Sequence, residues 1–253
     1  MTPKILLSRC YSEPIRYNGG IVNDDFINKL KQYIDFINVC PEVEIGLGVP
    51  RKRLIVVKTE NSKRFFQLET GKDFTERIIK FAEKTLTSLP EIDGFILKAK
   101  SPSCGVGSTK LYRNGFIVGK TYGFFAEQIR KKFPYLPLED EGRLKDEEIR
   151  KHFLVRIFAF SEVRELFEKI EPKSLVQFHT KYKYLLMTYS QKALKELGQI
   201  VADGNLSIKE KIHRYKIKFY EAFDRKPSIK RHVNTLTHLT GYISSKLNTK
   251  ERE

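Results

Sequence analysis

The sequence contains few cysteines and no long apolar segment. Three cysteines occur among 253 residues, and so small and odd a number argues against a scaffold built on disulfides. No apolar run approaches the roughly 20 residues of a membrane-spanning helix. The first apolar run, Ile5-Leu6-Leu7, is far shorter than the core of a secretory signal. We therefore expect a cytoplasmic protein with reduced thiols and no membrane partner.

Acidic residues are outnumbered, which points to a polyanionic partner. The chain carries 47 Lys and Arg against 31 Asp and Glu, a formal net charge of +16. Residues 211–253 alone hold eleven Lys or Arg against four Asp or Glu, a net of +7. Such an excess attracts nucleic acid, although a Lys-rich composition without such a partner is also typical of thermophilic proteins. The 12 Tyr and 18 Phe indicate a folded chain, because disordered segments are poor in aromatic residues.

The first half of the chain alternates short apolar runs with helix-like segments. This pattern predicts an α/β domain over residues 1–143, with an open, mostly parallel, Rossmann-like sheet and flanking helices. Strands are expected at Lys4–Ser8, Asp35–Val39, Leu54–Lys58, Phe65–Leu68 and Gly94–Ala99, and a hairpin turn at Asn114-Gly115. Helices are expected from Asp24 or Asp25 to Tyr33, from Phe74 to Leu86 and from Gly123 to Lys131.

The periodicity changes near Pro134 to Arg143, where prolines and a Glu-Asp-Glu-Gly segment interrupt it. Beyond this point the spacing predicts an all-α helical bundle over residues 144–253. The expected helices are Asp146–Ile170, Leu175–Leu197, Ile208–Phe223 and Ser228–Leu247.

The three cysteines each follow the end of a predicted strand. Cys10, Cys40 and Cys104 are too far apart in sequence to form a compact metal motif. The carboxyl ends of parallel strands share one edge of a sheet, however, so the three thiols can converge there. Three thiolates leave one coordination position open on a zinc ion or a cubane cluster. The alternative is three buried cysteines that serve only as small apolar residues.

Five motifs in order resemble the thiouracil desulfidase family. They are Lys4-Ile5-Leu6-Leu7-Ser8 before Cys10, Arg16-Tyr17-Asn18-Gly19-Gly20, Cys40-Pro41-Glu42, Gly46-Leu47-Gly48-Val49-Pro50-Arg51 and Ser101-Pro102-Ser103-Cys104-Gly105. The resemblance covers roughly residues 4–135 and is specific because the motifs occur together. It implies a 4Fe-4S cluster with three cysteine ligands, Cys10, Cys40 and Cys104, and one iron that lacks a protein ligand.

The resemblance also implies a hydrolytic, non-redox reaction in which water replaces the sulfur of a thiolated uracil. Glu42 is the expected general base and Ser101 the expected proton relay or base contact, with Ser103 and Glu44 as weaker candidates. A helix-capping or salt-bridging role for Glu42 is the alternative. The expected substrate contacts are Arg16, Tyr17, Arg51 and Ser103, with Tyr17 stacking on a base and the arginines meeting phosphate.

The C-terminal half resembles a YbgA-like helical domain. The resemblance rests on Phe178-His179, Lys183-Tyr184-Leu185-Leu186, Leu197-Gly198 and the segment from His232 to Tyr242. Fusions of the two domains are similar to desulfidases that act on 4-thiouridine in tRNA, so thiolated tRNA is the expected partner. The chain ends earlier than we expect for this domain, which indicates either a C-terminal truncation or a lineage in which the domain is short. The expected RNA-binding residues are His179, Lys183, His213, Arg214, Lys216, Lys218, Arg231, Asn234 and His238.

Three other functions stay open at this point. The protein could act on free 2-thiouracil or 4-thiouracil, or on the nucleosides, instead of tRNA. It could catalyse the reverse reaction as a tRNA thiolation enzyme. It could also be a non-catalytic RNA-binding module whose thiols hold zinc or nothing. The sequence leaves the oligomeric state open.

Overall fold

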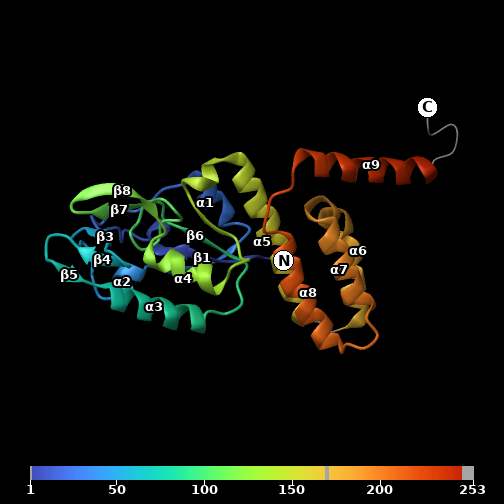
Figure 1. The fold of residues 1–253 in the computed structure, drawn as a ribbon, viewed down its shortest axis with the longest axis horizontal. Coiled ribbons are helices and arrows are strands. Elements are labelled where there is room, and N and C mark those ends of the chain that lie inside the picture. Colours follow the sequence, from blue (N-terminus) through green and yellow to red (C-terminus); the bar gives the residue numbers. More distant parts are fainter. Residues whose placement is uncertain (1, 169–170, 247–253) are drawn as a thin grey trace. The chain divides into compact units, whose positions relative to one another are not determined.

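The computed structural model describes residues 2–168 and 171–246. The chain divides into two compact units, Met1–Ser161 (unit 1) and Glu162–Glu253 (unit 2) (Figure 1). The strands are β1 (Lys4–Ser8), β2 (Asp35–Val39), β3 (Leu54–Lys58), β4 (Lys63–Gln67), β5 (Lys72–Asp73), β6 (Gly94–Leu97), β7 (Thr109–Arg113), β8 (Phe116–Thr121) and β9 (Leu138–Asp140). The α-helices are α1 (Asp25–Leu30), α2 (Pro41–Glu44), α3 (Thr75–Ser88), α4 (Phe124–Lys132), α5 (Glu147–Glu168), α6 (Pro172–Tyr189), α7 (Gln191–Ala202), α8 (Ile208–Ala222) and α9 (Ile229–Lys246). Two short 3-10 helices are η1 (Arg9–Tyr11) and η2 (Arg143–Lys145).

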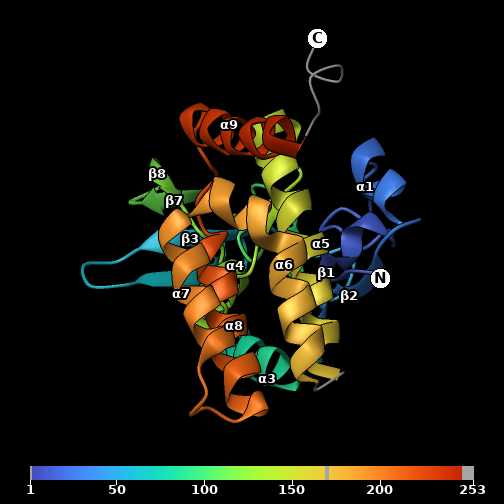
Figure 2. The ribbon, with the colours of Figure 1, turned by 90° about the vertical axis from the view of Figure 1, so that its right-hand side faces the viewer.

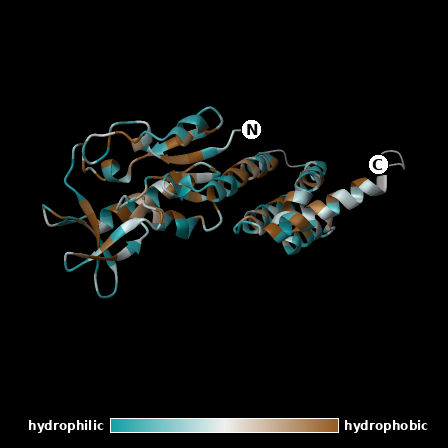
Figure 3. Cartoon of the chain, turned by 90° about the horizontal axis from the view of Figure 1, so that it is seen from above, coloured by the Kyte–Doolittle hydropathy of each residue, from teal (hydrophilic) through white to brown (hydrophobic). Residues whose placement is uncertain are grey.

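The first sheet of unit 1 has four parallel strands in the order β2-β1-β6-β9. Its central strands are apolar on both faces, because helices cover both. Ile5 and Leu7 of β1 pack in one cluster with residues of α1 and α5, whereas Leu6 packs on the opposite face with residues of α3 and α4. Each of these fully buried side chains contributes about 1.5–3 kcal/mol to folding. The expected open parallel sheet with flanking helices is confirmed, and in Figure 3 unit 1 contains brown, hydrophobic strand segments beside teal, hydrophilic ones.

The strands β3, β4, β5, β7 and β8 form a second sheet that the sequence pattern did not separate from the first. Its order is β5-β4-β3-β7-β8, and only the β3–β7 pair is parallel. The connections explain this difference, because a parallel pair needs a crossover of a dozen or more residues. Only Thr59–Ser62 separate β3 from β4, and Asn114-Gly115 joins β7 to β8 as predicted, with positive φ angles of 50° and 81°.

Helix α5 begins within unit 1. Phe153 and Ile157 pack in the same apolar cluster as Ile5 and Ile96 of the sheet. Along the chain, unit 1 therefore ends at Ser161 and unit 2 begins at Glu162, whereas the sequence placed the boundary near residue 143.

Unit 2 is a helical bundle, as expected, in which α6, α7 and α8 lie side by side (Figure 2). Its core is aromatic: Phe178 stacks on Tyr182 at 4.6 Å between ring centroids and meets Phe219 edge-on at 5.3 Å. The expected single helix Leu175–Leu197 was wrong, because the chain breaks at Ser190. The Ser190 side chain accepts a hydrogen bond from the Ala193 N–H and so caps a new helix, α7.

Helix α9 exposes much of its apolar surface. Leu236 is 59% exposed and Ile243 is 51% exposed, while Leu247, the expected end of this helix, lies outside the described residues. Thr235 is buried and contacts Thr188 through a 3.0 Å hydrogen bond between their side-chain oxygens. Among the described residues, no helix combines the length and apolar character needed to cross a bilayer.

Candidate active site

The three cysteines line one cavity of about 480 Å³ at the carboxyl edge of the first sheet. Cys10 lies in η1 directly after β1, Cys40 precedes α2 directly after β2, and Cys104 lies in the loop that follows β6. All three are buried and free of disulfides. Because β2, β1 and β6 are neighbouring parallel strands, the loops that carry the thiols share one edge of the sheet.

The Cys104 loop is held by the start of α4. The backbone N–H of Phe124 donates to the Pro102 carbonyl at 3.1 Å, and that of Phe125 donates to the Ser103 carbonyl at 2.9 Å. Gly123, which begins this helix, lies so close that a Cβ atom there would be 2.5 Å from the Ser103 carbonyl carbon. The loop backbone therefore has a fixed position against the helix N-terminus.

Glu42 lies in the same cavity with both carboxylate oxygens engaged. Ser103 Oγ donates to Glu42 Oε1 at 2.7 Å, and Ser101 Oγ donates to the same oxygen at 3.3 Å. Arg51 Nε donates to Glu42 Oε2 at 2.8 Å. The Ser103 hydroxyl is also 3.5 Å from Cys104 Sγ. This network connects the carboxylate to one of the thiols through a single hydroxyl.

Arg51 holds Glu42 in place and is itself anchored. Its Nη1 donates to the Ile15 carbonyl at 2.9 Å and to the Gly48 carbonyl at 3.2 Å, and its side chain is only 5% exposed. The guanidinium therefore contacts protein atoms, although Arg51 was expected to meet a substrate phosphate. Glu44, the weaker candidate base, lies outside the cavity lining and pairs with Arg9 at 3.0 Å.

Burial makes all three thiols harder to ionise. Burial, with the neighbouring Cys104 and Cys40 thiols, raises the pKa of Cys10 to about 12. Burial likewise raises the pKa of Cys104 to about 12, against the lowering effect of side-chain hydrogen bonds with Ser103 and Ser8. Burial also raises the pKa of Cys40. A bound cationic group would reverse this penalty, because thiols lose their protons when they bind metal.

The cavity offers sulfur donors in a form that suits a group larger than a single ion. Its described lining contains three thiols and no imidazole, a donor set that favours soft metals and iron–sulfur clusters. Among residues 2–168 and 171–246, no group of three His, Cys, Asp or Glu side chains is arranged to hold one metal ion. A cluster, in which different thiolates bind different iron atoms, fits more widely spaced sulfurs.

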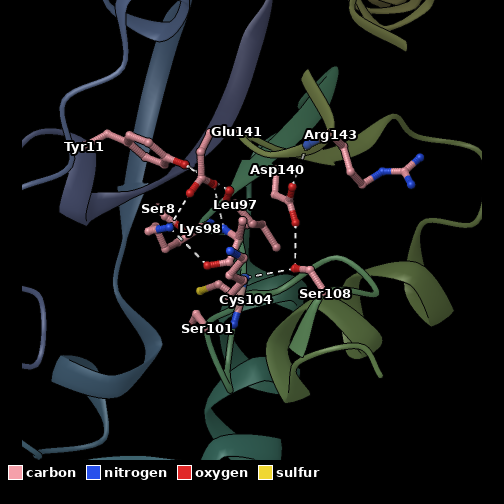
Figure 4. A network of polar contacts seen from close by, with 12 residues as sticks. Ser8, Tyr11, Leu97, Lys98, Ser101, Cys104, Ser108, Asp140, Glu141 and Arg143 are labelled. Carbon is pink, nitrogen blue, oxygen red and sulfur yellow. Dashed lines mark hydrogen bonds and ion pairs between the residues drawn. The ribbon is translucent and has the colours of Figure 1, made fainter. Parts of the chain in front are cut away.

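A second polar network, missed from the sequence, borders the cavity (Figure 4). Glu141 accepts hydrogen bonds from Tyr11 Oη at 2.6 Å, from the Ala99 N–H at 2.6 Å and from the Lys98 ammonium, with which it forms an ion pair. The Lys98 side chain lines the cavity and lowers the pKa of Cys10 against the larger effect of burial. Lys98 directly follows β6 at the carboxyl edge of the sheet, so its sequence position already indicated a place near the thiols. Glu141 follows the three-residue β9, which has no apolar run to reveal it.

The mouth of the cavity is basic and aromatic. Tyr17 is 48% exposed, with the Arg16 guanidinium 5.9 Å from its ring centroid. Arg53, Lys100 and Lys110 also line the cavity, although the sequence did not single them out. Among the described residues these three cations have no carboxylate partner, so their charge is available to an anionic group.

The residues expected to bind RNA are spread over unit 2. Those that are exposed are Lys183, His213, Arg214, Arg231, Asn234 and His238, and those that are half-buried are His179, Lys216 and Lys218. They come from α6, α8 and α9, and the structure does not gather all of them in one cavity.

Some of these residues already have partners within unit 2. Lys218 Nζ pairs with Glu196 at 2.7 Å and with Glu221 at 3.2 Å. Arg231 donates to the backbone carbonyl at the end of α6. His179 Nδ1 lies 3.1 Å from Tyr215 Oη, and burial together with Lys183 lowers its pKa, so the ring is neutral at pH 7.

Comparison with protein families divides the chain in two. A family model described as 2-thiouracil desulfurase matches residues 5–141. A second model, described as a protein of unknown function (DUF1722), matches residues 183–253.

Individual relatives match each part. The uncharacterized protein YbbK of Bacillus subtilis (strain 168) is 33% identical over 124 residues, which are 46% of this chain and 80% of that protein. The uncharacterized protein YbgA of Escherichia coli (strain K12) is 27% identical over 103 residues, 40% of this chain, and the match spans 61% of that protein's length. The solved structure of the 4Fe-4S-dependent thiouracil desulfidase TudS (DUF523Vcz) is 27% identical. That match covers 57% of this chain and 95% of that one, with a TM-score of 0.46.

Proposed function

Because the chain belongs to the 2-thiouracil desulfurase family, we propose that it converts 4-thiouridine in tRNA to uridine and releases hydrogen sulfide. The family matches confirm the resemblance of residues 4–135 to thiouracil desulfidases and of the C-terminal half to YbgA-like proteins. One observation carries the proposal: Cys10, Cys40, Cys104 and Glu42 line a single cavity. We place the reaction in the cytoplasm, where thiols stay reduced.

The cofactor we propose is a 4Fe-4S cluster held by Cys10, Cys40 and Cys104. When bound, it would supply an iron atom with an open coordination position, a Lewis acid for the sulfur of the base. The chemistry of the donors supports this assignment, since three buried thiols with raised pKa values need a cationic group to become thiolates. Lys98 adds a fixed positive charge beside them.

Glu42 is the proposed general base. The Arg51 guanidinium and the Ser103 hydroxyl hold its carboxylate in one orientation, so the carboxylate can take a proton from the water that attacks the sulfur-bearing carbon. The proton that Glu42 receives can then pass to the departing sulfur, which leaves as hydrosulfide, while the proton on the added oxygen is lost to solvent as the carbonyl forms. Ser101 accepts hydrogen bonds from the backbone N–H groups of Ser103 and Cys104, which directs its hydroxyl proton toward Glu42 or the base.

The charge at the cavity mouth favours a substrate with phosphate over a free base. Arg53, Lys100 and Lys110 line the cavity, are exposed to solvent and have no carboxylate partner among the described residues. A thiolated uracil base carries no phosphate to meet them, whereas a nucleotide within RNA does. Tyr17, exposed at the same entrance, provides a ring on which a neighbouring base can stack. Unit 2 would add backbone contacts, as its net positive charge suggests.

Anaerobically purified protein tests the proposal directly. The protein should contain about four iron atoms and about four acid-labile sulfide ions per chain, the composition of one 4Fe-4S cluster. Sulfide should be released when tRNA containing 4-thiouridine is added. The Cys40→Ala variant should lose both iron and activity. Sulfide release by iron-free protein would refute the mechanism. Faster turnover of free 4-thiouracil than of thiolated tRNA would identify the free base as the substrate. Sulfur transfer into unmodified tRNA would indicate a thiolation enzyme.

A further inference from the structure

Unit 2 has a cavity of its own, separate from the thiol site. It has a volume of about 350 Å³ and lies where the end of α6, the start of α7 and the start of α9 meet. Three cationic residues line it, Lys192, Lys230 and Arg231, together with polar side chains that include Ser190 and Asn234. Its described lining contains no carboxylate. The cavity is therefore suited to an anion.

The positive charge of this cavity is only weakly compensated. Lys230 is exposed and has no ion-pair partner among the described residues. Lys192 Nζ is 3.8 Å from Glu196 Oε1, but Glu196 forms a shorter contact of 2.7 Å with Lys218. An exposed ion pair at such a distance contributes little to stability, so the Lys192 ammonium remains available to another anion.

Arg231 provides the directional contact. One of its terminal nitrogens donates to the Tyr189 carbonyl at the end of α6, which fixes the guanidinium at the cavity. A guanidinium has five N–H donors in a rigid plane, so the remaining donors can bind two oxygens of one phosphate. The cavity thus combines the oriented guanidinium of Arg231 with the flexible ammonium groups of Lys192 and Lys230.

The beginnings of two helices add to this field. Helices α7 and α9 both start at the cavity, and neither has an acidic residue in its first turn. The first N–H groups of a helix lack acceptors within the helix and carry partial positive charge. The three cationic side chains provide most of the positive charge in the cavity, and the two helix N-termini add to it.

We propose that this cavity binds a backbone phosphate of RNA through Lys192, Lys230 and Arg231. The inference rests on the proposed function, because it assigns the part of unit 2 that would hold the tRNA substrate. It adds Lys192 and Lys230 to the residues expected from the sequence to bind RNA, which included Arg231 but neither lysine. A phosphodiester has the charge and the oxygen geometry that the three cations require.

Binding of an unmodified tRNA transcript tests the assignment independently of catalysis. The full-length protein is titrated into fluorescent transcript by anisotropy between 50 and 200 mM KCl, with the double variant Lys192→Ala/Lys230→Ala beside the wild type. The variant should bind about tenfold more weakly, and the slope of log affinity against log salt should fall by about two, one for each lost phosphate contact. Lys195→Ala is the matched control, because Lys195 is an exposed lysine of α7 that does not line the cavity.

Two further measurements separate the alternatives. Inorganic phosphate at constant ionic strength should weaken RNA binding by the wild type more than by the double variant. Equal affinity and equal salt slope for the double variant and Lys195→Ala would overturn the proposal, as would cavity-dependent binding of an acidic peptide but not of RNA. Sulfide release from tRNA containing 4-thiouridine by the iron-loaded wild type is followed separately. Its absence would remove the proposed function while the RNA result would stand.

Discussion

The substitution Glu42→Gln tests the catalytic network, because it removes one charge and preserves the shape of the side chain. Glu42 is 7% exposed, and its two oxygens accept from Ser103 at 2.7 Å and from Arg51 at 2.8 Å. The amide can keep an oxygen toward Arg51, but its NH₂ group then faces the Ser103 hydroxyl. The variant cannot accept a proton from water, and loss of a general base lowers turnover by about 10²–10⁴-fold.

The same structure predicts the cost in stability. Breaking a buried ion pair costs about 3–5 kcal/mol, and Arg51 retains two backbone carbonyl acceptors as well as the amide oxygen. We therefore expect a loss of about 2–3 kcal/mol, which corresponds to a decrease in Tm of roughly 5–10 °C for a unit of this size. The variant should still fold and incorporate iron at room temperature, so catalysis and stability can be measured on the same preparation.

The assay is anaerobic sulfide release from tRNA containing 4-thiouridine, with rates normalised to iron content. Glu44→Gln is the control, because Glu44 is 42% exposed, pairs with Arg9 and lies outside the cavity lining. We expect the rate of Glu44→Gln to stay within about threefold of the wild type, because Glu44 does not line the cavity. Its fold should also be retained, since an exposed ion pair contributes only about 0–1 kcal/mol to stability. A Glu42→Gln variant with full iron content and a rate within the same limit would refute the role of Glu42 as the base.

Three other predictions follow from the cavity, its entrance and the helical unit. Gly123→Ala should lower both iron content and Tm, because the new Cβ would displace the Ser103 backbone, whereas Gly119→Ala, with open space around it, should change neither. The double variant Arg53→Ala/Lys110→Ala should lower kcat/KM for 4-thiouridine monophosphate by about tenfold, the equivalent of one charge-assisted hydrogen bond, and leave that for 4-thiouracil nearly unchanged; equal losses for both would exclude a phosphate contact. Because burial lowers the pKa of His179 below its usual 6.5, its neutral form favours the folded state, and that stability is lost as pH falls below about 6.5. Thermal unfolding of unit 2 between pH 7.5 and 5.5 should therefore depend less on pH in His179→Gln.

Local sequence was sufficient for the elements that carry the thiols. The strands β1 and β2 were placed with the bounds that the structure has. A buried parallel strand such as β1 leaves a continuous apolar signal, and the edge strand β2 still carries the apolar residues Phe36, Ile37 and Val39. The Asn114-Gly115 turn was equally local, since its positive φ angles restrict it to such residues. The break at Ser190 was missed because the apolar spacing continues from α6 into α7, and only the cap reveals the interruption.

The sequence by itself determined which residues carry the chemistry: three thiols that each follow a strand, a Pro-Glu pair after the second and a Ser-Pro-Ser segment before the third. Only the tertiary structure decided how they act together, because the contacts that define the site join residues far apart in the chain. Glu42 meets Ser103 across 61 positions, and Tyr11 meets Glu141 across 130. Such contacts depend on which strands become neighbours and on the direction of each side chain in the folded chain. Those depend on packing, which the local pattern of residues does not encode.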